Sequence, residues 1–156
     1  MKMEKKEDFE TFDEQEKRAR RRLRTKALVK AALLAGLVVF ILPAGGPWMS
    51  TEAFTAVMGR IMAKNPIVDL VAHFILAMAY GWVVGACIYS LPTAAGIIFG
   101  TLLGVPLYGL NYVICGFLAG YPANELHAVI AHLVFCLFFS VAYRAMAISS
   151  PRRKVA

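Results

Sequence analysis

The chain has 156 residues, and 59% of them are hydrophobic, which is more than a soluble domain of this size can cover with polar surface. The 17 lysine and arginine residues against 10 aspartate and glutamate residues give a formal net charge of +7. No aromatic residues alternate with the basic ones, as a surface that stacks nucleic-acid bases would require. The composition therefore argues against a nucleic-acid partner and predicts an integral membrane protein.

Residues 1–26 are expected to form a charged arm, acidic from Glu4 to Glu16 and basic from Arg18 to Lys26. A basic tail, 149–156, follows the last apolar stretch. Because basic flanks of membrane helices stay in the cytoplasm, both termini are predicted to be cytoplasmic, which requires an even number of crossings. The basic excess also predicts attraction to anionic lipid headgroups.

The first apolar stretch, 27–42, is short and contains Lys30, whose long side chain can reach the membrane surface from near the start of a helix. A cleaved signal peptide is the rival interpretation. The preceding region is too long and too acidic for one, and Pro43 is a poor neighbour for a cleavage site. We therefore expect a retained first membrane helix.

The connection that follows, 43–65, begins with helix-breaking proline and glycine residues. After Glu52, apolar residues recur every three or four positions, at Phe54, Val57, Met58, Ile61 and Met62. This spacing predicts a short amphipathic helix in the first external loop.

Three longer apolar stretches, 66–91, 93–119 and 123–147, each reach the roughly 20 residues that cross a bilayer. The connections between them are very short, so consecutive helices should be antiparallel neighbours. Together with 27–42 they predict an all-α, four-helix transmembrane domain over 27–148. Pro106 predicts a kink in the third span.

Glycines at four-residue intervals indicate how these helices pack. They are Gly81 and Gly85 in the second span, and Gly96, Gly100 and Gly104 in the third. Small residues at this interval share one helix face and let two backbones approach closely. Packing within the subunit is favoured over a dimer face.

Polar residues of three spans are predicted to lie at similar depth in the outer half of the bilayer. At about 1.5 Å per residue, His73 lies roughly 10 Å, His132 roughly 13 Å and Asn111 about 12 Å from the outer ends of their spans. Asp69 precedes His73 by four residues, Glu125 precedes His132 by seven, and Tyr108 precedes Asn111 by three, so each pair shares a helix face. The pattern predicts a polar funnel with the carboxylates at its mouth.

Three interpretations of this cluster stay open. Its side chains can serve only to hold helices together in a structural or accessory protein. They can carry protons or a divalent metal ion in a transport protein, with Asp69, His73, Glu125 and His132 as candidate metal ligands. His73 and His132 can also hold haem b between opposing helices. The first interpretation, without a cofactor, is the expected one.

No enzyme activity is expected, because the sequence has no Gly-x-Ser-x-Gly turn and no phosphate-binding loop. Four short helices enclose little volume, so a transport role would require a homo-oligomer or a larger membrane complex.

Three features of the sequence carry a resemblance to a known family. The first is His73 with Phe74, Ala77 and Tyr80, and the second is the glycine-rich next span. The third is Glu125, followed by the His-Leu-Val-Phe run that starts at His132 and then by Arg144. The stretch 73–144 resembles the YagU-like group of bacterial inner-membrane proteins of unknown function. The resemblance implies four membrane helices and residence in a bacterial inner membrane, and it implies no activity. Where that group has a histidine in its third span, this sequence has Asn111 or Tyr112, which puts shared metal or proton chemistry in doubt.

Overall fold

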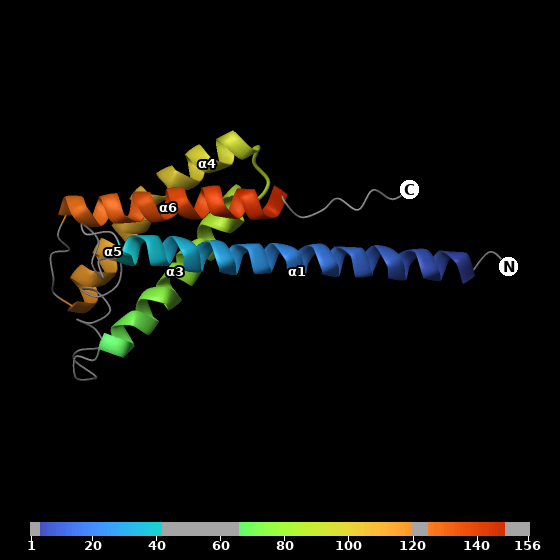
Figure 1. Ribbon diagram of the computed structural model, residues 1–156, viewed down its shortest axis with the longest axis horizontal. Coiled ribbons are helices and arrows are strands. Elements are labelled where there is room, and N and C mark those ends of the chain that lie inside the picture. Colours follow the sequence, from blue (N-terminus) through green and yellow to red (C-terminus); the bar gives the residue numbers. More distant parts are fainter. Residues whose placement is uncertain (1–3, 42–65, 120–124, 149–156) are drawn as a thin grey trace.

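A computed structural model describes residues 4–41, 66–119 and 125–148, and every regular element in these ranges is a helix. The helices are α1 (Glu4–Ile41), α3 (Pro66–Ile88), α4 (Thr93–Leu102), α5 (Gly104–Ala119) and α6 (Glu125–Ile148) (Figure 1). The all-helical prediction is confirmed for this part of the chain. The amphipathic helix predicted within 43–65 and the basic tail 149–156 lie outside the described residues.

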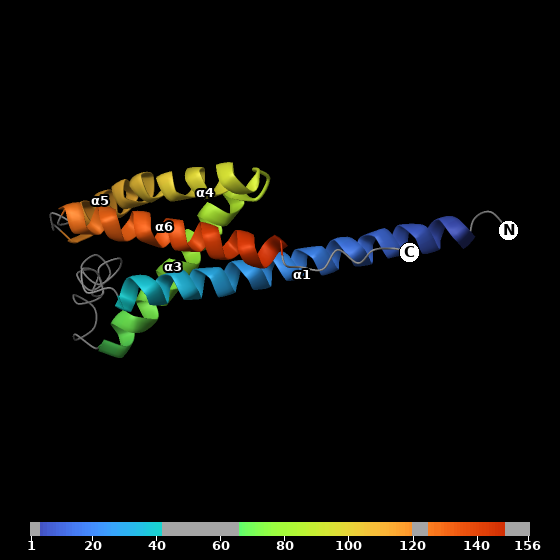
Figure 2. The ribbon, with the colours of Figure 1, turned by 45° about the horizontal axis from the view of Figure 1, so that its top comes forward.

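Helix α1 runs without a break through the predicted boundary between the charged arm and the first apolar stretch. Its sequence explains this, because good helix formers dominate it and no proline interrupts it. Ion pairs between residues four apart, Arg18 with Glu14 and Arg20 with Glu16, add local support on the exposed part. Figures 1 and 2 show this N-terminal half of α1 projecting beyond the other helices, while burial begins at Ala27.

The third predicted span is divided between α4 and α5 by Leu103, so the prediction of one helix over 93–119 is corrected to two helices. Pro106 gives the physical reason, because it has no N–H to donate and its ring crowds the carbonyl of Leu102, four residues earlier. Leu103 keeps right-handed backbone angles, with φ −61° and ψ −16°. The chain therefore continues across the break in nearly the same direction instead of reversing.

Three segments of the described chain are long and apolar enough to cross a membrane: Leu70–Ile88, Thr93–Val113 and Val129–Ala147. The apolar part of α1 is not among them, since it contains Lys30 and ends at Ile41 within the described residues. The structure thus supports three of the four predicted crossings by length and composition. The fourth crossing stays a prediction.

Helix α6 occupies the centre of the bundle and contacts each of the other four helices. Its buried face carries a stack of aromatic rings, with ring centroids 6.2 Å apart for Phe135 and Phe139 and 5.7 Å apart for Phe139 and Tyr143. The buried face of α1 consists mostly of small residues, Ala27, Ala31, Ala32 and Ala35, with Val39 after them. The large rings of α6 therefore pack against a narrow helix face, and α1 can lie close to both α6 and α3.

Candidate functional site

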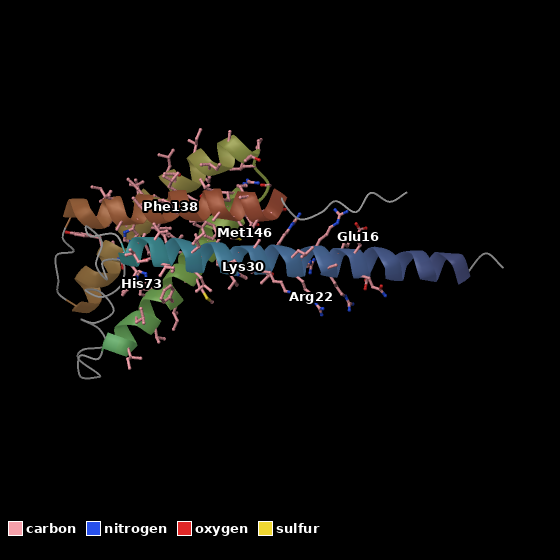
Figure 3. All side chains as sticks on the ribbon, viewed as in Figure 1. Glu16, Arg22, Lys30, His73, Phe138 and Met146 are labelled. Atoms are coloured by element: carbon pink, nitrogen blue, oxygen red, sulfur yellow. The ribbon has the colours of Figure 1, made fainter. Side chains whose placement is uncertain are left out.

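His73 is completely buried and joins α3 to α1. Its Nε2 lies 3.0 Å from the backbone carbonyl oxygen of Gly36. Because a carbonyl oxygen only accepts hydrogen bonds, Nε2 carries the hydrogen and donates it. The ring also packs against Phe40 of α1 and Phe74 of α3, with centroid distances of 5.8 and 5.4 Å. Figure 3 places His73 where α1 and α3 cross.

The close approach of α1 and α3 depends on small residues at four-residue intervals on both helices. A Cβ added to Gly36 would lie 3.0 Å from Cβ of Ala77, and one added to Gly81 would lie 2.8 Å from Cβ of Ala32. A Cβ on Gly85 would meet Leu28 at 3.0 Å. These contacts run in opposite directions along the two chains, so the helices are antiparallel and His73 continues the same face by one turn.

His132 of α6 lies between two tyrosine rings that come from different helices. Its ring centroid is 5.7 Å from that of Tyr80 on α3 and 5.8 Å from that of Tyr108 on α5. The His132 side chain is buried, as is that of Asn111 on α5. The structure therefore brings together three helices around His132, and Tyr108 is one of the residues that the sequence assigns to the cluster.

The two histidines thus have different neighbours. The hydrogen bond of His73 is made to α1, whereas the ring contacts of His132 are made to α3 and α5. Asp69 lies in α3 and Glu125 is the first residue of α6, but their side chains lie outside the described part of the structure. The mouth of the predicted funnel is therefore a prediction that the structure leaves open.

Tyr80 is a site residue that the sequence analysis did not place in the cluster. It is buried and contacts both His132 and Phe135, the latter with a centroid distance of 6.4 Å. A signal for it was present in the sequence, because Tyr80 follows His73 by seven residues and so lies on the same face of the helix.

No group of three or more histidine, cysteine, aspartate or glutamate side chains is close enough to hold a metal ion among the described residues. The described free cysteines are Cys87, which is exposed, and Cys136, which is buried. Neither lies in a cluster of metal-ligating side chains within that part of the chain.

Arg144 forms a second polar site at the other end of the bundle. Its guanidinium donates to the carbonyl oxygens of Ile88 and Leu91, the second at 2.8 Å, and so caps the C-terminal end of α3. Gly96 makes room for it, because a Cβ there would overlap the Arg144 guanidinium. Close by, the guanidinium of Arg24 lies 5.4 Å above the ring of Tyr89. The sequence analysis used Arg24 for membrane orientation and Arg144 for the family resemblance, and it assigned neither of them to a site.

Comparison of the chain with protein-family models, with curated proteins and with solved structures finds no match. The resemblance to the YagU-like group therefore stays a prediction from the residues quoted for it.

Proposed function

We propose that this chain is a small multi-pass membrane protein with a structural or accessory role, in which buried histidines connect helices. The observation that carries the proposal is the hydrogen bond from His73 to the carbonyl of Gly36, at a position with no exposed surface. A buried side-chain donor that reaches the backbone of a neighbouring helix fixes the relative position of the two helices. An accessory role implies association with further copies of the chain or with a larger membrane complex.

The proposed location is the inner membrane of a bacterial cell, with both termini in the cytoplasm. The three apolar segments support a membrane location, and the basic residues at both ends of the chain support the orientation. The resemblance to the YagU-like group is what supports a bacterial inner membrane. An even number of crossings then requires the apolar half of α1 to be the fourth.

His73 and His132 have different neighbours, which argues against a haem or metal ion held between them. The Nε2 of His73 donates to Gly36, so a metal ion would need to displace this bond or bind the other ring nitrogen. We therefore propose no cofactor and no enzyme activity for this chain.

Transport coupled to protons or metal ions is the alternative function, and the surroundings of His132 are the observation that favours it. Imidazole titrates near neutral pH, and two tyrosine rings lie beside this one. Buried titratable groups in a membrane domain often line proton pathways.

A pair of variants at His73 separates the two functions. Glutamine at this position keeps an N–H donor, whereas leucine has no donor. Neither side chain can take up or release a proton. The structural role predicts that His73→Leu lowers the free energy of unfolding in detergent micelles by about 1 kcal/mol, with His73→Gln retaining most of the stability.

Proton movement by the purified protein in vesicles, followed with a pH-sensitive dye, is the second measurement. The structural proposal expects no flux from the wild-type chain. A wild-type flux that a folded His132→Gln variant abolishes would contradict it and support the transport function.

A further inference from the structure

One face of α1 carries cations at successive four-residue intervals, and Arg18, at the N-terminal end of this row, is paired with Glu14. Arg22, Lys26 and Lys30 are spaced by four residues, and all three are exposed. This spacing places them one above the other on the same side of the helix. In Figure 3, Arg22 and Lys30 lie on the side of α1 that is turned away from α6.

The same face continues as an apolar surface. Leu33 and Leu37 follow Lys30 by three and seven residues, which places them on the same side of the helix, and they are 40% and 44% exposed. We call Arg22, Lys26, Lys30, Leu33 and Leu37 the outer stripe of α1. It is basic at one end and apolar at the other.

The cations of the outer stripe have no carboxylate partner among the described residues. The two described acidic side chains of α1, Glu14 and Glu16, pair with Arg18 and Arg20 instead. Elsewhere at this end of the bundle, Arg24 lies over Tyr89 and Arg144 donates to carbonyl groups. The outer stripe thus presents positive charge that the described chain leaves uncompensated, beside an exposed apolar surface.

We propose that the outer stripe binds an anionic phospholipid, with its phosphate at Arg22, Lys26 and Lys30 and an acyl chain along Leu33 and Leu37. The inference rests on the membrane location proposed above. Complementary charge supplies attraction to the headgroup, and the two leucines account for the apolar end. A free phosphate ion or an acidic protein segment would match only the basic end.

The test uses the purified full chain in neutral detergent micelles, with bound lipids counted by native mass spectrometry. The probes are short-chain phosphatidylglycerol, which is anionic, and phosphatidylcholine, which is zwitterionic. Wild-type protein should bind the anionic lipid at least about tenfold more tightly, since each cation near an anionic headgroup contributes roughly fivefold in affinity. Equal binding of the two lipids would overturn the proposal.

The variant R22Q/K26Q/K30Q should lose about tenfold or more of its affinity for phosphatidylglycerol and bind phosphatidylcholine as before. The matched control K17Q/R20Q/R21Q removes three exposed cations of the same helix that do not lie on the row of the outer stripe. It should keep most of its affinity for phosphatidylglycerol. An equal loss in both variants would show that only net charge matters, and displacement of the lipid by millimolar inorganic phosphate would assign the stripe to a free anion; either result overturns the proposal.

Failure of this proposal can be told apart from failure of the proposed function. Resistance of the chain to extraction from membranes by alkaline carbonate tests membrane insertion alone. Circular dichroism of both triple variants shows whether they keep the helical fold, which is expected because every substituted residue is exposed.

Discussion

Gly104 lies against the backbone of another helix. A Cβ at this position would be 2.8 Å from the carbonyl oxygen of His132 and 2.9 Å from Cα of Leu133. Both atoms belong to the main chain of α6, so no side-chain rotation can relieve the clash. The contact also places α4 and α5 beside the His132 site, because Gly104 is the first residue of α5.

We expect Gly104→Ala to lower the free energy of unfolding by about 1–3 kcal/mol, the usual cost of forcing extra volume into packed structure. Gly109 supplies a matched control in the same helix, because a Cβ there would meet nothing within 4 Å. Gly109→Ala should be neutral or add up to about 1 kcal/mol through helix propensity. Chemical unfolding in micelles measures both, and equal effects would contradict this account of α5 packing.

For single residues, the sequence predicted that His73 and His132 lie in the membrane domain, but it did not predict which residues they contact. A four-residue glycine interval identifies a helix face, yet it does not say which helix covers that face. Gly81 meets Ala32 of α1 and Phe139 of α6, and Gly100 meets Ser140 of α6. Likewise the acceptor of His73 is a backbone carbonyl, and every residue has one, so no side-chain pattern could reveal Gly36.

At the scale of elements, the end of α3 depends on a side chain from α6. Arg144 donates to two carbonyl groups at the C-terminus of α3, and its guanidinium lies against Gly96 of α4. One residue therefore holds three helices together where the chain turns from α3 into α4. Carbonyl groups at a helix end have no partner within the helix, which is why a cation is effective there.

Arg144→Gln should lower the free energy of unfolding by about 2 kcal/mol, the scale of hydrogen bonds that involve a charged donor. Arg144→Lys should lose roughly half as much, because an ammonium group keeps the charge but not the planar fork that reaches two carbonyls. Arg18→Gln is the control, since its exposed ion pair contributes less than about 1 kcal/mol. Thermal unfolding in micelles ranks the variants by stability. An Arg144→Gln variant as stable as Arg18→Gln would contradict the capping role.

The helices themselves were largely predictable, because long apolar stretches and short connections leave few alternatives. The predicted 66–91 and 123–147 correspond to α3 (Pro66–Ile88) and α6 (Glu125–Ile148). Two features differed: α1 continues through the charged arm, and α4 ends before Leu103. The hydropathy pattern did not predict this continuation, because helix propensity and not apolar burial extends α1 beyond its apolar stretch. The proline pointed to the kink, but the break falls in the preceding turn, where the crowded carbonyl lies.

At the scale of the whole molecule, the basic part of α1 lies at the same end of the bundle as the turn between α3 and α4. The contact between Arg24 and Tyr89 places these two regions together, and Figure 1 shows the C-terminal end of α6 beside them. The opposite end carries the C-terminus of α1 and the N-termini of α3 and α6. This arrangement agrees with an even number of crossings.

Cysteine labelling tests that arrangement. With the three native cysteines replaced by serine, Thr25→Cys and Pro92→Cys should react with a membrane-impermeant maleimide only after the cells are broken, because basic flanks remain in the cytoplasm. Both positions are exposed in the structure. Labelling of the two positions from opposite sides of the membrane would contradict the bundle as a four-crossing domain.

Continuity of α1 has a mechanical consequence. Taking the contact of Ala32 with Gly81 as a pivot, the helix extends about 42 Å toward Glu4 and about 14 Å toward Ile41, at 1.5 Å per residue. About this pivot, a sideways displacement of the Glu4 end of a rigid α1 would move the Ile41 end in the opposite direction with a third of the amplitude. A rigid α1 would therefore pass a sideways force on its N-terminal end to Gly36 and Phe40, which contact His73 of α3.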